Sequence, residues 1–472
     1  MPEPIHRSAR QIATDIVRRL QNAGFSAFWV GGCVRDFLLG REPGDYDIVT
    51  SALPEQIEKL FKRTVAVGRQ FGVMVVAEGQ QQFQVATFRA EADYRDGRHP
   101  ETISFGDARA DALRRDFTVN GLFYDPVADQ LHDWVGGEAD LRAKLIRTIG
   151  SPEARFAEDH LRLLRAVRLA AQLDFQIEPG TFAALQFNAA KIKAISAERI
   201  RDELVKMFAP PPPGVAPSGG PEAPGERPTE VGTPNGIRAA RGLELLRDST
   251  LLEHILPEVA ATIACEQSPD FHPEGTVFAH LCLMLKHLPP GAPLSLPWAV
   301  LMHDIAKPLT ASRDSATGSI HFYEHEKIGA RMAEEILERL RFPRKQIEEV
   351  ASAVRYHMQF KDAMQMRKST LRRLLMRETF PLELQLHRLD CLGSHGRLDV
   401  YDFLVAQSAE LAKKPEIRPP LLTGSDLIKL GMKPGPALGG LLAELREKQL
   451  QDELHTPAQA RAWVKQKIEK GD

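Results

Sequence analysis

Cysteine is scarce in this chain of 472 residues. Its four cysteines, Cys33, Cys265, Cys282 and Cys391, lie far apart and form no CxxC pair. A disulfide framework or a zinc ribbon would need cysteines at short, repeated spacing, so the sequence argues against both. We therefore expect the protein to work in a reducing compartment.

Long apolar runs are also missing. The N-terminal stretch MPEPIHRSARQIATDIVRRL is charged and amphipathic and lacks the apolar centre of a secretory signal. No later run approaches the length that a membrane-spanning helix needs. We predict a cytoplasmic protein with no membrane partner. Its length predicts several domains, because single hydrophobic cores stop growing well below this size.

The chain has almost no net charge, with 61 lysines and arginines against 63 aspartates and glutamates. A globally basic surface for nucleic acid is therefore excluded, and any RNA contact must come from a local patch. A solvated helix face is the alternative for most single members of such a patch. The candidate patch consists of Arg142, Lys144, Arg147, Arg155, Arg162, Arg165 and Arg168.

Proline and glycine are concentrated in one segment. Residues 210–234 hold nine prolines and five glycines. This composition cannot bury enough apolar surface to order itself, so we predict a linker or a surface insertion. The segment separates two stretches with helical character.

Hydrophobic periodicity changes near Gly150. Before it, short β-rich runs (FSAFWV, YDIVT, VMVVAE and FQVATF) alternate with helical runs such as Leu53 to Phe61. After it, apolar residues recur at helical spacing, first over Asp159 to Leu173. The sequence predicts an α/β head followed almost entirely by helices.

A glycine pair precedes two spaced carboxylates in the predicted head. Gly31 and Gly32 lack the Cβ atoms that would keep the backbone away from a triphosphate, and the following VRDFLLG is typical of a helix that opens from a turn. Asp45 and Asp47 are two residues apart, so on a strand both point to one face. Two carboxylates and substrate phosphates would fill the shell of Mg²⁺. The pattern predicts metal-assisted nucleotidyl or phosphoryl transfer, with Asp45 and Asp47 as catalytic metal ligands.

Two further motifs carry paired charges. Arg114, Arg115 and Asp116 suit triphosphate neutralisation and a hydrogen bond to a ribose hydroxyl, although a surface ion pair explains them equally well.

Asp159 and Arg162 are three apart on a predicted helix and therefore neighbours. Such a pair can read the Watson–Crick edge of cytosine or adenine and reject uracil, with an ordinary intrahelical salt bridge as the alternative. The stripe continues toward phosphate or RNA with Arg165 and Arg168.

Histidines and aspartates recur in the second half of the chain and resemble an HD-type metal-dependent phosphohydrolase domain. Adjacent His303 and Asp304 can both reach a metal from a helix end, with distant residues completing the shell. The predicted second metal site is His280, His303, Asp304 and Asp390, and His325 and His357 belong to the same series. Helix-capping or core histidines are the alternative.

Together the motifs resemble the bacterial class II tRNA nucleotidyltransferase and poly(A) polymerase family. The resemblance rests on GGCVRDFLLGREPGDYDI, RRDFTVNGLFYDP, DWVGGEADL, EDHLRLLRAVRLA, SAERIRDEL and LLTGSDLIKLGMKPGPALGGLL. It implies an α+β fold with a β-polymerase-like nucleotidyltransferase head followed by an all-α neck, body and HD-like and tail region. It also implies nucleotide binding by Gly31, Gly32, Arg35, Arg114, Arg115, Asp116, Asn120, Asp159, Arg162, Arg165 and Arg168.

The resemblance divides the chain into six segments. They are a catalytic head (1–150), a helical neck with base-reading and RNA-binding motifs (151–208), a Pro/Gly-rich linker (209–236), a helical body (237–270), an HD-like helical domain (271–405) and a helical tail (406–472).

The implied activity is template-independent addition of CCA to tRNA 3′ ends from CTP and ATP by a two-metal mechanism. The expected cofactors are Mg²⁺ in the head and Ni²⁺, Mn²⁺ or Co²⁺ in the HD-like domain. The expected partners are tRNA or other RNA 3′ ends, and no protein partner is predicted. The run from Arg89 to Pro100 resembles the loop that accompanies adenosine addition. At one position the chain departs from the family, because Gln84 stands where a third acidic residue is expected.

Other functions remain open at this point. A poly(A) polymerase would use ATP alone on RNA 3′ ends, and no single motif separates it from a CCA-adding enzyme. An HD-type RNA-repair phosphohydrolase with a decayed head is supported only by Gln84. A non-enzymatic RNA-binding scaffold would require the nucleotide motifs to be vestigial.

Overall fold

The computed structural model describes residues 7–68, 72–89, 105–208, 233–269, 272–413, 420–451 and 453–470. Its chain forms two compact units. Unit 1 consists of Met1–Cys265, Thr276–Pro297 and Ile336–Pro343, and unit 2 of Glu266–Gly275, Trp298–Glu335 and Arg344–Asp472. Most of the predicted linker and of the predicted loop after Arg89 lies outside the described residues. The finer division into six segments stays a prediction.

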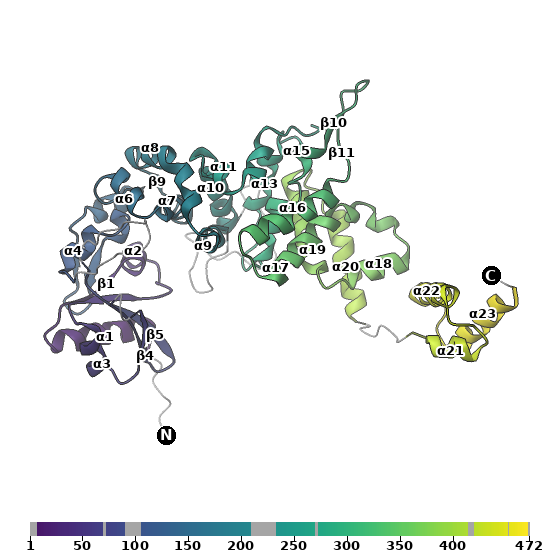
Figure 1. Ribbon diagram of the computed structural model, residues 1–472, viewed down its shortest axis with the longest axis horizontal. Coiled ribbons are helices and arrows are strands. Elements are labelled where there is room, and N and C mark those ends of the chain that lie inside the picture. The colour runs from purple at the N-terminus through teal and green to yellow at the C-terminus, as the bar shows by residue number, and fades with distance from the viewer. Residues whose placement is uncertain are drawn as a thin grey trace. The chain divides into compact units, whose positions relative to one another are not determined.

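A seven-stranded sheet forms the N-terminal part of unit 1 (Figure 1). Its strands are β1 (Ala27–Val30), β2 (Asp47–Thr50), β3 (Thr64–Gly68), β4 (Val73–Glu78), β5 (Gln81–Thr87), β6 (Phe123–Asp125) and β7 (Gln130–His132). Their order in space is β3-β4-β5-β2-β1-β6-β7. β2 pairs with β5 in parallel, and the other neighbours pair antiparallel. The strand β2, which begins at the predicted metal ligand Asp47, is therefore the central strand of the sheet.

Short helices surround this sheet. They are α1 (Ala9–Asn22), α2 (Gly32–Leu38), α3 (Pro54–Leu60), α4 (Ala108–Leu113), α5 (Gly137–Arg142) and the 3-10 turn η2 (Thr118–Asn120). α1 begins at a capping box, in which Ser8 and Gln11 each accept a hydrogen bond from the backbone N–H of the other. α1 packs on β1 with Ile12, Ile16 and Leu20 buried.

The rest of unit 1 is largely helical. Its elements are α6 (Pro152–Glu158), α7 (Leu161–Leu173), α8 (Pro179–Asn188), η3 (Ala189–Ala194), α9 (Ala197–Phe208), α10 (Pro234–Asp248), α11 (Leu251–Ile255), α12 (Pro257–Ala260), η4 (Ala261–Ala264), α13 (Val277–Lys286) and the paired strands β8 (Leu145–Ile146) and β9 (Gln176–Ile177). α7 packs against both α9 and α10, which explains its many buried residues. The predicted helix over Asp159 to Leu173 begins later than expected, because Asp159 has extended backbone angles.

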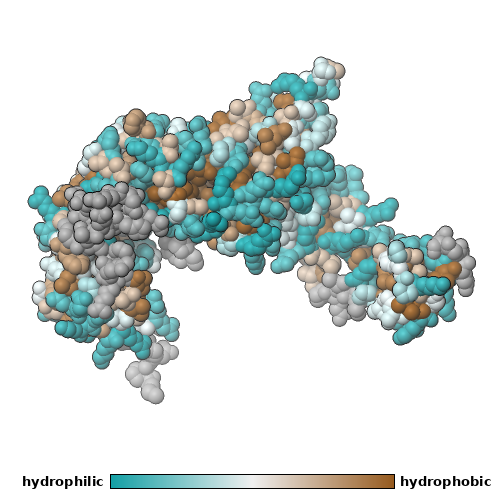
Figure 2. Space-filling model, viewed as in Figure 1, coloured by the Kyte–Doolittle hydropathy of each residue, from teal (hydrophilic) through white to brown (hydrophobic). Residues whose placement is uncertain are grey.

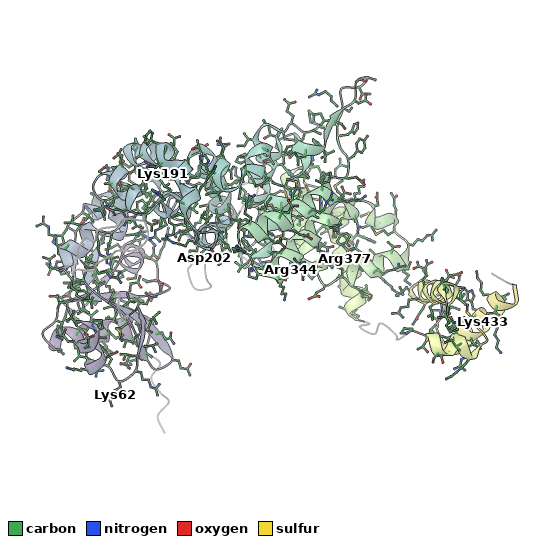
Figure 3. The ribbon with its side chains drawn as sticks, in the orientation of Figure 1. Lys62, Lys191, Asp202, Arg344, Arg377 and Lys433 are labelled. Atoms are coloured by element: carbon green, nitrogen blue, oxygen red, sulfur yellow. The ribbon has the colours of Figure 1, made fainter. Side chains whose placement is uncertain are left out.

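Unit 2 is helical apart from one hairpin, β10 (Ala311–Arg313) and β11 (Ile320–Phe322). Its helices are α15 (Lys307–Thr310), α17 (Arg344–Tyr356), η5 (His357–Gln365), α18 (Lys368–Leu375), α19 (Phe380–Gly393), α20 (Asp399–Ala412), α21 (Gly424–Lys429), α22 (Pro436–Leu450) and α23 (Pro457–Lys470), while α14 (Ser295–Met302) and α16 (His325–Arg339) each contribute residues to both units. One apolar core gathers around Phe360, Phe380 and Leu404. A separate core joins α21, α22 and α23, and Lys433 lies in the connection between the first two (Figure 3).

A buried ion pair connects α17 to α19 in unit 2. Arg377, labelled in Figure 3, donates to Glu383 at 2.7 Å and lies over the ring of Tyr356. Glu383 also accepts from the hydroxyls of Thr379 and Ser352. Burial raises the pKa of Glu383, although these partners oppose the rise. The network satisfies a carboxylate that would otherwise be costly to bury.

The exposed residues and the four cysteines are arranged as the sequence led us to expect. On the face in Figure 2, hydrophilic residues cover much of the surface and hydrophobic residues lie between them. All four cysteines are buried and unbridged. Among the described helices, none combines the length and the apolar character that crossing a membrane requires.

We expect Gly236→Ala to destabilise unit 1. A Cβ at Gly236, near the start of α10, would lie 2.1 Å from the carbonyl oxygen of Lys286 and 2.4 Å from that of Leu285, at the end of α13. Backbone oxygens cannot move without displacing a helix, so the free energy of unfolding should fall by about 1–3 kcal/mol. The control is Gly440→Ala in α22, where a Cβ meets nothing within 4 Å. Thermal unfolding measures both, and an unchanged melting temperature for Gly236→Ala would contradict the close packing.

Candidate functional site

A glycine turn joins β1 to α2. Gly31 caps α2 with a φ of 75°, in the left-handed region that favours glycine. A Cβ at Gly31 would lie 3.3 Å from Nη1 of Arg115, and one at Gly32 would lie 3.6 Å from Nη2 of Arg35. Two guanidinium groups therefore border the turn, as an anion-binding site requires.

The two predicted metal ligands lie at the start of β2. The prediction of a strand for both was wrong for Asp45, because the strand begins only at Asp47 and Asp45 lies in the bend before it. The alternation holds nevertheless: Asp45 is exposed, Tyr46 is buried and Asp47 is half-buried. Burial and the charge of Asp45 raise the pKa of Asp47, while Arg115 lowers it. Two close carboxylates of this kind favour a bound cation.

Gln84 lies beside Asp47 on the neighbouring strand. Ile48 of β2 pairs with Val85 of β5, so the residue before each of them is also adjacent. Within the described ranges, no third Asp, Glu, His or Cys joins Asp45 and Asp47 in a group of ligand atoms that lie within 4.8 Å of one another. The protein thus offers two charged ligands here and a neutral amide as neighbour.

A chain of hydrogen bonds links the glycine turn to α7. Arg35 Nη1 donates to Asn120 Oδ1 at 2.8 Å, and Asn120 Nδ2 donates to Asp116 Oδ1 at 3.3 Å. Asp116 Oδ2 accepts from Nε and Nη2 of Arg165 at 2.8 and 2.6 Å. Burial would raise the pKa of Asp116, but Arg165 and the N–H of Phe117 hold it at about 2. Four predicted nucleotide-binding residues are thereby brought together.

Asp111 was not among the predicted site residues, although it contacts two of them. This buried residue of α4 accepts from Nε of Arg114 at 2.9 Å and from Nε of Arg115 at 3.2 Å. The signal was present, because a carboxylate three and four residues before two arginines is their neighbour on a helix.

The side chains of Asp159 and Arg162 have other partners, although the backbone N–H of Arg162 donates to the carbonyl oxygen of Asp159 at 3.0 Å. Asp159 Oδ2 accepts from Nη2 of Arg199 at 2.8 Å, and its Oδ1 accepts from the N–H of Leu161 at 3.0 Å. Arg162 donates to Glu158 at 2.5 Å. The helical-spacing argument was wrong for this pair because Asp159 lies in the break between α6 and α7. Base reading by the two residues stays a prediction.

Most of the predicted basic patch is paired with carboxylates. Arg168 donates from Nε to the buried Glu203 of α9 at 2.5 Å, and Arg147 donates to Asp140 at 3.1 Å. The other pairs are Arg142 with Glu138, Arg155 and Arg162 with Glu158, and Arg165 with Asp116. All six arginines therefore take part in ion pairs within unit 1, although Arg142 and Lys144 are exposed, and RNA binding by the patch stays a prediction.

A cluster of histidines surrounds Asp304 in unit 2. His325 Nε2 lies 3.4 Å from Asp304 Oδ1, and His357 Nε2 lies 3.9 Å from the same oxygen. The two Nε2 atoms are 3.2 Å apart. His303 Nε2 lies 3.1 Å from Asp304 Oδ2. All four side chains are buried.

Local backbone contacts set the tautomers of these histidines. The Nδ1 atoms of His303, His325 and His357 lie 2.9, 2.8 and 2.6 Å from carbonyl oxygens, which can only accept. The neutral rings of His325 and His357 therefore carry the proton on Nδ1 and turn the lone pair of Nε2 toward Asp304. Burial, aided by His303, lowers the pKa of His357 to about 3, so its ring is neutral. The arrangement fits a cation bound by imidazoles and one carboxylate.

The remaining residues of the predicted second site are placed differently. Asp390 of α19 and His303 offer ligand atoms within 4.8 Å of one another. His280 is a residue of unit 1, on α13, and its part in this site stays a prediction. Sequence reasoning missed Lys307, whose Nζ donates to Asp304 at 2.7 Å and to Gln267 at 2.6 Å. Burial raises the pKa of Asp304, but His303 and Lys307 reverse this and hold it well below its usual range.

Three regions of the chain match known protein families. Residues 27–147 match the poly A polymerase head domain, residues 272–392 match the HD domain, and residues 174–215 match a family described as the probable RNA and SrmB-binding site of polymerase A. Residues 27–147 and 272–392 are therefore similar to a poly A polymerase head domain and to an HD domain, as the motifs predicted.

A curated relative matches part of the chain. The CCA-adding enzyme of Staphylococcus aureus (strain MRSA252) is 43% identical over 203 residues, which are 43% of this chain and 50% of the relative. The chain thus spans about half the length of the curated relatives that it matches.

Solved structures support the fold over the whole chain. The Bacillus stearothermophilus CCA-adding enzyme in complex with CTP is 24% identical, with a TM-score of 0.71, and the match covers 98% of this chain and 99% of that one. The Thermotoga maritima CCA-adding enzyme complexed with tRNA is 18% identical, with a TM-score of 0.55 and coverage of 97% and 95%. The predicted α+β fold class is confirmed.

We expect Asp116→Asn to lower the free energy of unfolding at neutral pH. The native pKa of about 2 lies below the ordinary value of 3.8, so the ionised carboxylate stabilises the folded state. This contribution, about 2 kcal/mol, is complete above the unfolded pKa and is lost as the pH falls through the native pKa. The stability difference from wild type should be constant between about pH 8 and pH 5 and should shrink below about pH 4. Denaturant unfolding across this range measures it, and a difference independent of pH would contradict the ion pair with Arg165.

Proposed function

We propose that this protein is a template-independent RNA 3′-terminal nucleotidyltransferase that adds CCA to tRNA from CTP and ATP. The observation that carries the proposal is the position of Asp45 and Asp47 next to a glycine turn that Arg35 and Arg115 border, within a poly A polymerase head domain. The names of the relatives support it, since the matched proteins are CCA-adding enzymes and the solved ones include complexes with CTP and with tRNA.

The residues fit a divalent cation in the head. Asp45 and Asp47 are the carboxylates that would hold Mg²⁺, and burial together with the charge of Asp45 raises the pKa of Asp47. Bound Mg²⁺ supplies charge neutralisation and a lowered pKa for the attacking 3′-hydroxyl. Arg115 and Arg35 neutralise the phosphates at the glycine turn. A two-metal mechanism would draw its remaining ligands from the substrate phosphates.

In this proposal the base is selected by Asp159, between α6 and α7, and by Arg162, in the first turn of α7. Asp159 offers acceptors and Arg162 offers donors, which suit cytosine and adenine. In the free protein Arg199 and Glu158 occupy these groups. Nucleotide binding therefore exchanges ion pairs for base contacts. A poly(A) polymerase with ATP as its only nucleotide is the rival function for the same site.

We also propose a second function for unit 2, the hydrolysis of phosphate esters at RNA 3′ ends. The specific observation is the convergence of the His325 and His357 lone pairs on Asp304, in a region that matches the HD domain. Imidazole ligands favour Ni²⁺, Mn²⁺ or Co²⁺ over Mg²⁺. Removal of a 2′,3′-cyclic phosphate would free the hydroxyl that the head requires as nucleophile.

The first function predicts ordered incorporation into a tRNA that lacks its terminal CCA. With each labelled nucleotide supplied in turn, we expect C and then A to be added. Asp45→Asn and Asp47→Asn should each slow single-turnover addition about a thousandfold, because metal assistance contributes several kcal/mol. Asp15→Asn, on the exposed face of α1, is the control. Long runs of A alone would establish the rival polymerase, and near-normal rates in either site variant would refute the metal assignment.

The second function predicts metal binding and phosphodiesterase activity. Wild-type protein should bind Ni²⁺, Mn²⁺ or Co²⁺ and hydrolyse bis(p-nitrophenyl) phosphate and cyclic nucleotides. His325→Ala combined with His357→Ala should abolish both properties, because each change removes an Nε2 ligand. His321→Ala, an exposed residue of β11, serves as the matched control. Equal activity in the double variant and wild type, or equal metal content measured by mass spectrometry, would remove this site.

A further inference from the structure

Asp111 is a buried carboxylate that holds two guanidinium groups at once. Its Oδ1 accepts from Nε and Nη2 of Arg114 at 2.9 and 2.5 Å. Its Oδ2 accepts from Nε and Nη2 of Arg115 at 3.2 and 3.0 Å. Each arginine thus gives the same edge of its guanidinium to Asp111 and keeps its Nη1 for another acceptor.

The position of Arg115 indicates what that acceptor is. Its Nη1 faces the glycine turn, 3.3 Å from where a Cβ of Gly31 would be, and its guanidinium packs over the ring of Phe123 at 5.2 Å from the centroid. Its charge also acts on Asp47. The phosphates of a nucleotide whose metal is held by Asp47 would have to pass between these groups.

Asp111 itself is fixed in the head. Its Oδ1 accepts from the backbone N–H of Arg89 at 3.1 Å, just after β5. The next residue of α4, Ala112, packs in the core with Val30 and Phe123. A carboxylate anchored in this way restricts the rotamers of both arginines before a ligand arrives, which reduces the entropy lost on binding.

We propose that Asp111 is a positioning residue for the triphosphate of the incoming nucleotide. It aligns Arg114 and Arg115, and two guanidinium charges against one carboxylate leave one positive charge for the phosphates. The inference rests on the proposed nucleotidyl transfer and adds a residue to that site. Asparagine at this position would offer one oxygen and an amide donor to five N–H groups, four of them from the arginines, so at least one arginine would turn away.

A purely structural ion pair would change stability and leave phosphate binding unchanged. Asp140 of α5 provides the comparison, because it is also buried and accepts from Nε of Arg147 at 3.1 Å and from the hydroxyl of Thr118 at 2.7 Å. Asp140→Asn therefore serves as the matched control for Asp111→Asn.

The test measures inhibition of CTP incorporation by inorganic tripolyphosphate, together with KM for CTP and for the RNA. For Asp111→Asn we expect the inhibition constant and KM for CTP to rise about tenfold or more, while KM for the RNA changes little. For Asp140→Asn we expect a lower melting temperature and an unchanged inhibition constant.

An unchanged inhibition constant in Asp111→Asn, or an equal rise in both variants, overturns the inference. If Asp111→Asn does not fold, Asp111→Glu keeps the charge and displaces both guanidinium groups by one methylene, and the same two outcomes decide. Absence of incorporation by the wild type would instead refute the proposed function. Calorimetric titration of tripolyphosphate into the same proteins would then decide the role of Asp111, with weaker binding to Asp111→Asn supporting it and equal binding refuting it.

Discussion

The ion pair between Asp116 and Arg165 is the interaction on which the candidate site depends. Asp116 belongs to the segment after α4, and Arg165 belongs to α7, 49 residues later. Because only 10% of the Asp116 side chain is exposed, its charge would be costly without a bidentate partner. With its second oxygen Asp116 holds Asn120, and Asn120 holds Arg35 beside the glycine turn. The orientation of Arg35 is thus linked to α7, which packs against α9 and α10.

Other ion pairs between a carboxylate and a guanidinium group surround the pair of Asp116 and Arg165. Glu203 of α9 pairs with Arg168, and Glu158 pairs with Arg162. Asp111 pairs with Arg114 and Arg115, the two arginines that follow α4. These pairs place a carboxylate beside most guanidinium groups of the basic window. A sequence shows how many charges lie in a window, but it does not show carboxylates that reach it from another helix, as Glu203 reaches Arg168 across 35 residues.

Local signals predicted the elements of the site well and its partners less well. The glycine turn, the helix after it and the strand that carries Asp47 follow from backbone sterics and alternation, which act over a few residues. The break at Asp159 was missed because no proline or glycine marks it. An aspartate ahead of an apolar run is, however, also typical of a helix start, and the Asp159 side chain does accept from the N–H of Leu161. That reading would have separated Asp159 from the helical stripe of Arg162.

In the region that matches the HD domain, one local contact repeats at three histidines, but only the fold brings the three residues together. His303, His325 and His357 each face the carbonyl oxygen of the residue three positions earlier, Val300, Phe322 and Val354. One short-range geometry therefore directs three Nδ1 atoms to backbone carbonyl oxygens, but packing brings the three Nε2 atoms to Asp304. The resulting ligand set differs in kind from that of the head. Two carboxylates suit a hard cation and imidazoles suit a transition metal, so ligand chemistry alone would direct different metals to the two regions.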